Sequence, residues 1–219
     1  MAIARTVLRE QVKDILLQRI IRGDLQAGDR LVETRIAQEL GTSQAPVREA
    51  MRDLELLRLV ESEPFRGARV RGFSEAELIE VYPVRAVLEE LAAREATARL
   101  DGDVSILEEE VAEMRAAAAR GDLHGLVQND FAFHRKIVEA AGNDVLLQCW
   151  KTLGVEGRIT ITIYGTQVDP GDAAELHVPI LEAIRSRSVT AAGREARRHV
   201  EYFVKLARRR ALPRAGTSR

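Results

Sequence analysis

Residues 31–71 place the tightest constraint on how this chain folds. In 36–40 the apolar residues stand three and four positions apart, which marks one face of a short helix. Gly41 follows as a helix stop, and Ser43 stands where the N-cap of a second helix is expected. Pro46 then lies in the first turn of the second helix, where a missing backbone N–H costs little. The pattern predicts two short helices joined by a tight turn.

The second of these helices has two different faces. Its apolar residues form one stripe that would pack inward, and its other face carries polar and cationic side chains close to the N-terminal end. A helix that is packed behind and offers Gln and Arg is shaped to enter the major groove of DNA. The side chains expected to contact DNA from this helix are Ser43, Gln44, Arg48 and Arg52.

The residues after this helix predict a small basic hairpin. Two short strand candidates, 59–62 and 68–71, flank a turn that contains Pro and Gly. Its arginines suit contact with phosphate or the minor groove, and Arg66 and Arg69 are the expected contacts. A helical hairpin with a solvated charged face is the alternative, but the ordered set of helix, turn, capped helix and basic hairpin favours a winged helix-turn-helix.

Length and composition fit a soluble protein of two modest domains, because the 219 residues are 46% hydrophobic and 31% charged. We expect a winged helix-turn-helix domain over 1–72 and an all-helical domain over 73–219, so that the fold class is mostly α. Residues 1–72 carry 13 Lys and Arg against 11 Asp and Glu. DNA binding would therefore depend on where the arginines lie and not on net charge. The second domain reads as a bundle of about six helices, at 74–99, 104–120, 122–141, 143–164, 172–186 and 189–210.

The remaining composition signals predict a cytoplasmic protein with no membrane partner. No apolar run approaches the length of a membrane span, and the N-terminal residues lack the apolar core of a signal peptide. The single cysteine, Cys149, cannot form an internal disulfide. Its apolar surroundings beside Trp150 predict a buried, inert thiol.

Polar side chains stand on the inward faces of three predicted helices. Asp130 and His134 are four positions apart and so project from one face, while His177 and His199 each lie on an apolar stripe of another helix. Each could be a core group that is simply hydrogen-bonded, but burying all four unpaired would be costly. Three imidazoles and a carboxylate suit a divalent metal, and Zn²⁺, Ni²⁺, Mn²⁺ and Fe²⁺ all remain open.

These motifs, in this order, resemble those of GntR-type transcriptional regulators of the FadR-like group, whose effector domain is the all-helical FCD domain. Within 12–71 the resemblance rests on 21–23 (IRG), 27–31 (AGDRL), 37–41 (AQELG), 46–50 (PVREA) and 66–68 (RGA). Within 74–208 it rests on 82–85 (YPVR), Leu88 with Glu89, 130–134 (DFAFH), 141–143 (AGN), His177 with 180–184 (ILEAI), and His199.

The resemblance implies a homodimer that binds an inverted-repeat operator in double-stranded DNA and is controlled by a small molecule. It also implies that Asp130, His134, His177 and His199 are the metal ligands, at the floor of a pocket for a small carboxylate. We expect Zn or Ni first, with Mn or Fe still open. Candidates for binding the effector's negative charge are Arg85 and Arg158, since an Arg side chain can donate two parallel hydrogen bonds to a carboxylate. The alternative for Arg85 is a salt bridge within its own helix, to Glu89.

One departure from the family pattern limits what can be carried over. The family commonly opens the DNA-reading helix with Ser-Arg-Thr-Pro, whereas 43–46 here read Ser-Gln-Ala-Pro. A Gln at this position favours adenine over guanine, so the operator of other members does not transfer. The sequence thus indicates a ligand-responsive transcriptional regulator, a repressor and not an enzyme. The alternatives are a hydrolase-like enzyme with a metal-activated water, and a repressor that senses the metal directly.

Overall fold

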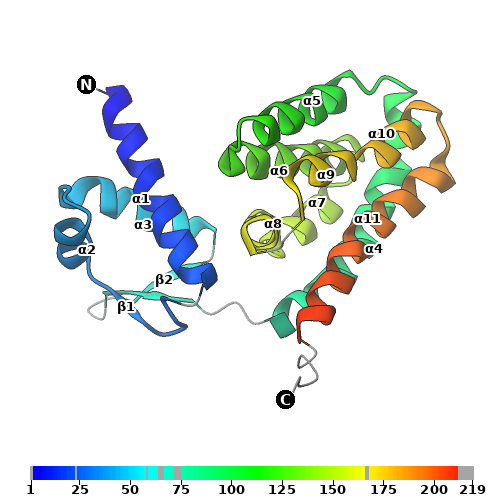
Figure 1. Cartoon of the computed structure of the whole chain (residues 1–219). Coiled ribbons are helices and arrows are strands. Elements are labelled where there is room, and N and C mark those ends of the chain that lie inside the picture. The colour runs from blue at the N-terminus through cyan, green and yellow to red at the C-terminus, as the bar shows by residue number, and fades with distance from the viewer. Residues whose placement is uncertain are drawn as a thin grey trace, which may run out of the picture. The chain divides into compact units, whose positions relative to one another are not determined.

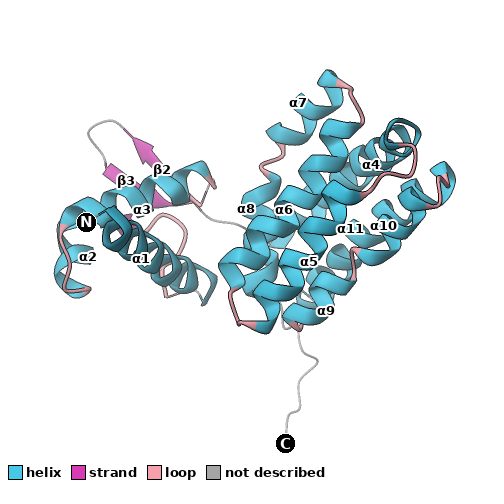
Figure 2. Cartoon of the chain, turned by 90° about the horizontal axis from the view of Figure 1, so that it is seen from above, coloured by secondary structure: helices cyan, strands magenta, loops and turns pink. Residues whose placement is uncertain are grey.

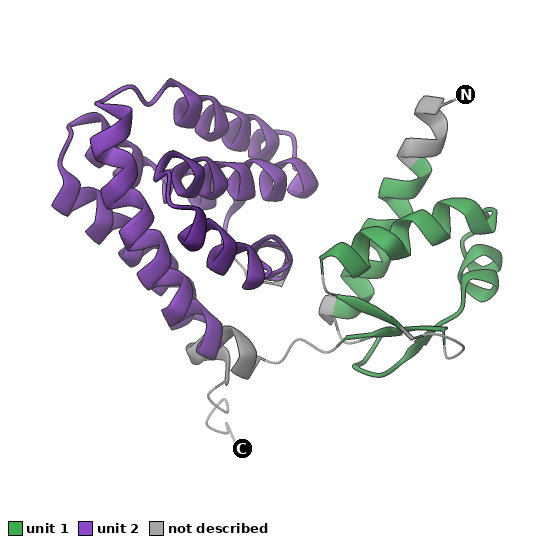
Figure 3. Cartoon of the chain, turned by 180° about the vertical axis from the view of Figure 1, so that it is seen from behind, with its two compact units in different colours: residues 1–73 green, residues 74–219 purple. Residues whose placement is uncertain are grey.

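The computed structural model describes residues 2–22, 24–57, 59–63, 67–71, 75–165 and 168–211. The chain divides into two compact units, residues 1–73 and 74–219, which Figure 3 draws in green and purple. The first unit combines helices with a small sheet, and the second is helical throughout its described part. The predicted fold class, mostly α with a winged helix-turn-helix ahead of a helical domain, is confirmed.

The first unit is built around one helix, α3, against which both other helices of the unit pack (Figure 1). A three-stranded antiparallel sheet with the order β1-β3-β2 completes it, and β2 also contacts α3. The inward face of α3 is closed to solvent, with Val47, Ala50 and Leu54 each 0% exposed. Its elements are α1 (Ala2–Arg22), β1 (Arg30–Leu31), α2 (Glu33–Glu39), α3 (Gln44–Leu56), β2 (Val60–Glu63) and β3 (Gly67–Val70).

The turn between α2 and α3 matches the sequence pattern in all but one detail. Gly41 has a φ of 62°, a conformation that glycine adopts without a steric penalty. Ser43 is the N-cap residue of α3 and has an extended backbone, but its side chain makes no capping hydrogen bond. Its hydroxyl is exposed and is not used to hold the helix end.

The second unit is a bundle of helices in which α11 lies along α4 and α5 packs against α6 (Figures 1 and 2). Helix α6 also contacts α4, α8 and α9, so it runs through the centre of the unit. The helices are α4 (Glu75–Leu100), α5 (Ser105–Ala119), α6 (Leu123–Ala140), α7 (Asp144–Thr152), α8 (Val155–Gly165), α9 (Pro170–Glu175), α10 (Val178–Arg185) and α11 (Val189–Ala211).

Two of the six helices expected here are each divided in two. The expected helix 143–164 is broken between α7 and α8, where Gly154 takes a φ of 61°. The expected helix 172–186 begins two residues earlier, at Pro170, and is broken between α9 and α10. Pro179 lies in the first turn of α10 and has no N–H to continue a hydrogen-bonded helix from α9. His177 becomes the N-cap residue of α10 as a result.

The environment predicted for the cysteine is wrong. Cys149 is exposed, whereas its neighbour Trp150 is only 1% exposed and belongs to the core of the second unit. Neighbouring residues of a helix point about 100° apart, so one can be buried beside an exposed one. Among the described residues, no helix combines the length and the apolar character needed to cross a membrane.

Candidate metal centre and DNA-binding face

Four polar side chains from α6, the start of α10 and α11 meet in the interior of the second unit. Asp130, His134, His177 and His199 are between 0% and 5% exposed. The Nε2 atoms of His134 and His199 are 3.2 Å apart, and the ligand atoms of the three histidines all lie within 4.8 Å of one another. Asp130 places its two carboxylate oxygens 3.6 Å from His134 Nε2 and 3.4 Å from His177 Nε2. The structure therefore brings together all four residues that the sequence suggested as metal ligands.

The other ring nitrogen of each histidine is held by an oxygen atom. The Nδ1 contacts are His134 to Glu89 Oε2 at 2.8 Å, His177 to the Ala173 carbonyl at 3.0 Å, and His199 to the Leu176 carbonyl at 3.2 Å. Carbonyl oxygens accept hydrogen bonds, so the Nδ1 atoms of His177 and His199 carry the proton. In a neutral ring this leaves Nε2 with an open lone pair, and the three Nε2 atoms converge.

Burial keeps the rings of His177 and His199 neutral. It lowers the pKa of His177 to about 4, and it lowers the pKa of His199 well below its ordinary value, with the other histidines adding to the effect. Within the described part of the chain, Asp130 Oδ1 and His177 Nε2 are buried without a hydrogen-bond partner. Lone pairs that face one another beside a carboxylate repel unless a cation lies among them. The donor set thus fits a divalent metal ion.

Glu89 connects this cluster to two further buried side chains. Its Oε1 accepts hydrogen bonds from Arg85 Nε at 2.6 Å and from Trp150 Nε1 at 2.9 Å, while its Oε2 faces His134. Burial alone would raise the pKa of Glu89, but the positive charge of Arg85 and the contact with His134 hold it well below its usual range. The sequence suggested Glu89 as a salt-bridge partner of Arg85 and as part of the family resemblance, but not as a contact of His134 or Trp150. Its position four residues after Arg85, on a helix facing the polar cluster, was the available signal.

The two arginines proposed for the effector lie in different settings. Arg85 is 2% exposed, and its ion pair with Glu89 realises the alternative that the sequence left open. Its Nη2 is nevertheless buried without a hydrogen-bond partner among the described residues. Arg158 is 8% exposed, and its Nη1 donates to the carbonyls of Leu153 and Gly154, just after the end of α7. Nη2 of Arg85 is therefore available as a donor, while Nη1 of Arg158 is engaged with the backbone.

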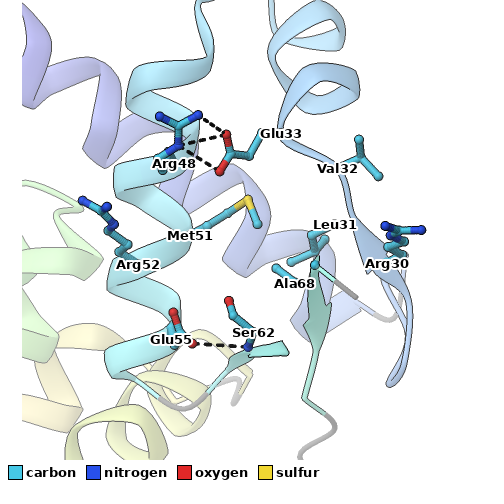
Figure 4. A pocket seen from close by; sticks show the side chains of 11 residues that line it. Arg30, Leu31, Val32, Glu33, Arg48, Met51, Arg52, Glu55, Ser62 and Ala68 are labelled. Atoms are coloured by element: carbon cyan, nitrogen blue, oxygen red, sulfur yellow. Dashed lines mark hydrogen bonds and ion pairs between the residues drawn. The ribbon is translucent and has the colours of Figure 1, made fainter. Parts of the chain in front are cut away.

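The residues predicted to read DNA are gathered on the outer side of α3. Ser43, Gln44, Arg48 and Arg52 are all exposed there. Arg52 Nη1 donates to Glu49 at 2.9 Å, and Arg48 pairs with Glu33 across the helix-turn-helix (Figure 4). On the wing, Arg69 is half-buried and its Nη1 donates to the carbonyl of Gly28 at 3.0 Å. Arg66 lies outside the described residues.

Two family models match the chain, one for each unit. The model described as bacterial regulatory proteins, gntR family, matches residues 8–70, and the model of the FCD domain matches residues 80–202. A probable D-xylose utilization operon transcriptional repressor from Paenarthrobacter nicotinovorans is 35% identical over 202 residues, covering 92% of this chain and 89% of the relative. The gluconate operon transcriptional repressor of Bacillus licheniformis is 32% identical over 139 residues. The matched region covers 63% of this chain and 57% of that relative.

Solved structures of similar fold cover almost the whole chain. Escherichia coli McbR/YncC matches with a TM-score of 0.63 at 21% identity, over 93% of this chain and 98% of that one. A putative GntR transcriptional regulator from Rhodococcus sp. RHA1 matches with a TM-score of 0.62 at 24% identity, over 94% and 99% of the two chains. At these identities the likeness concerns the fold.

Proposed function

The chain belongs to the GntR family of bacterial transcriptional regulators and carries an FCD domain, and from this premise we propose that it is a repressor released from its operator by a small organic acid. Its relatives are regulators and not enzymes, so the hydrolase alternative is set aside. The observation that carries the proposal is the cluster of three buried histidines inside the effector domain, whose ligand atoms lie within 4.8 Å of one another and two of which contact Asp130. A population shift between two packings of this domain would change how the winged helices meet DNA.

In this proposal the metal is held by Asp130, His134, His177 and His199. When bound, a divalent ion attracts oxygen donors such as the carboxylate of an acid. Glu89 positions the ring of His134, since its Oε2 lies 2.8 Å from Nδ1 and Nε2 faces Asp130 and His199. The open Nη2 of Arg85 supplies a charged donor for an effector carboxylate.

Two relatives are named for operons of D-xylose and gluconate, which are a sugar and a sugar acid. A sugar acid offers both a carboxylate for Arg85 and hydroxyl oxygens for the metal. We therefore propose a hydroxylated small acid as the effector.

The direct test combines DNA binding with an effector screen. The protein should retard DNA from its own upstream region at moderate salt, and a true effector should both weaken that binding and raise the melting temperature of the metal-loaded protein. The screen should include sugars, sugar acids and other small acids. Absence of specific retardation at that region and neighbouring promoters would refute the proposal. DNA affinity that follows metal concentration and ignores all acids would favour direct metal sensing.

The proposed homodimer has a suitable face on α4. Val84, Val87 and Leu91 are 50%, 52% and 42% exposed, and their spacing puts them on one side of the helix. Glu80 and Arg94 are exposed as well and stand seven positions on either side of Val87. If two copies pack α4 antiparallel about a two-fold axis at Val87, Glu80 lies opposite the partner subunit's Arg94. The stripe is thus apolar at its centre and self-complementary in charge at its ends.

This interface is tested by placing a charge at its centre. Val87→Asp should convert the protein to a monomer in analytical ultracentrifugation and weaken operator binding, because the two half-sites lose their linkage. Val145→Asp is the matched control, since Val145 is 74% exposed on α7. A Val87→Asp protein that stays dimeric at micromolar concentration would rule this face out.

A further inference from the structure

Arg48 of α3 is held by a glutamate from another helix. Glu33, the first residue of α2, accepts from Arg48 Nε at 3.1 Å and 3.0 Å through its two oxygens, and from Nη2 at 2.7 Å. Figure 4 shows the carboxylate against one side edge of the guanidinium. This contact joins residues 15 positions apart across the helix-turn-helix.

Packing does not explain the orientation of this side chain. Arg48 is 51% exposed, and it lines a cavity of about 460 Å³ between α3 and the sheet. The stem of Arg48 therefore borders open space, and the carboxylate fixes the plane of the guanidinium. The side edge formed by Nε and Nη2 is occupied, which leaves the end formed by Nη1 and the remaining N–H of Nη2 pointing away from Glu33.

We propose that Glu33 is a specificity-determining residue, which holds Arg48 so that its end-on pair of donors reads a base edge with two acceptors, as guanine presents in the major groove. The inference rests on the proposed function, in which α3 enters that groove. A guanidinium fixed in advance loses less side-chain freedom when it meets the correct base. The negative charge of Glu33 also opposes contact with phosphates, so the pair weakens binding to DNA of the wrong sequence.

The neighbouring ion pair on α3 lacks these properties. Arg52 meets Glu49 through a single contact, three positions away on the same helix, and its side chain is 64% exposed. Replacing Glu49 by Gln removes the same negative charge as replacing Glu33. Glu49, however, does not hold the guanidinium of Arg52 through two nitrogen atoms. Glu49 is therefore the matched control for Glu33.

The experiment measures the ratio of affinities for the operator and for a scrambled duplex, over a range of salt concentrations. Glu33→Gln should reduce this ratio roughly tenfold, while binding to the scrambled duplex stays the same or tightens. Glu33→Asp keeps the charge but is one methylene shorter, so it should lose discrimination in the same way. Glu49→Gln should leave the ratio unchanged. Thermal melting confirms that each variant is folded.

Two outcomes overturn the inference and can be told apart from failure of the proposed function. If the wild type discriminates and Glu33→Gln discriminates equally well, Glu33 has no such role. The same holds if Glu49→Gln lowers the ratio as much as Glu33→Gln. A wild-type protein that prefers no operator would refute the proposed function, and the inference with it.

Discussion

Each unit of the molecule contains an arginine held by a glutamate, and the two pairs differ in their access to water. Arg48 and Glu33 are 51% and 29% exposed on the side of the first unit that we propose faces DNA, whereas Arg85 and Glu89 are 2% and 3% exposed inside the second. An exposed pair contributes little to stability, and its arginine can exchange the carboxylate for another partner. A buried pair has no such freedom, because either charge left alone would lie in a medium of low polarity. One pair is suited to recognition, and the other supports the packing around the proposed metal site.

The largest difference between the pairs should appear when the buried glutamate is removed. Glu89→Ala leaves Arg85 as an uncompensated buried charge and also releases His134 and Trp150, so it should lower the free energy of unfolding by about 3–5 kcal/mol. Urea denaturation of the full chain measures this change. Glu89→Gln, which keeps one oxygen acceptor, should lose less. A Glu89→Ala protein as stable as the wild type would mean that the two environments are equivalent.

Replacing one of the proposed metal-binding side chains should lower metal binding by the second unit and leave the first unit unchanged. His134→Ala should lower the affinity for the metal by more than the roughly 10–100-fold that is typical when a residue supporting a ligand is removed. Elemental analysis of the purified protein gives the metal content. His124→Ala is the control, because His124 lies outside the cluster of ligand atoms. Unchanged metal content in the His134→Ala protein would refute the site.

Removal of the exposed arginine should affect DNA binding but not stability. Arg48→Ala should weaken operator binding roughly ten- to a hundredfold, because one good bidentate contact with a base contributes about that factor to the affinity. Gel retardation at fixed salt measures the loss, and circular dichroism should show the same helical content and melting temperature as the wild type. Tight, specific binding by this variant would contradict the docking of α3.

The smallest effect is expected for the exposed glutamate. Glu33→Ala breaks the ion pair with Arg48 in contact with water, so the denaturation midpoint should stay within the scatter of the wild-type measurements. A clear fall in stability would show that this pair supports the fold, and the comparison between the two pairs would then lose its basis.

Periodicity predicted much of this molecule, because it directly records which face of an element is buried. Asp130, His134, His177 and His199 stood on inward stripes, and the structure places all four together. The breaks at Gly154 and Pro179 were missed because apolar spacing continues across them. A two-residue strand such as β1 is too short to leave a pattern.

The contacts that Glu33 and Glu89 make with other helices could not be read from spacing in the same way. Glu33 meets Arg48 from a different helix, and Glu89 reaches His134 and Trp150 across the bundle. Such contacts depend on how helices cross, which one sequence does not state. An acidic residue beside an arginine looks the same in sequence whether the pair is exposed or buried.

The placement of Trp150 gives the protein an intrinsic optical reporter. It is the single tryptophan of the chain, and its indole N–H donates to the same carboxylate that holds His134. Indole emission responds to nearby charge, so its wavelength and intensity follow changes in the Glu89 carboxylate. The proposed binding of a metal and of an acid should therefore be measurable by fluorescence titration of the unlabelled wild-type protein.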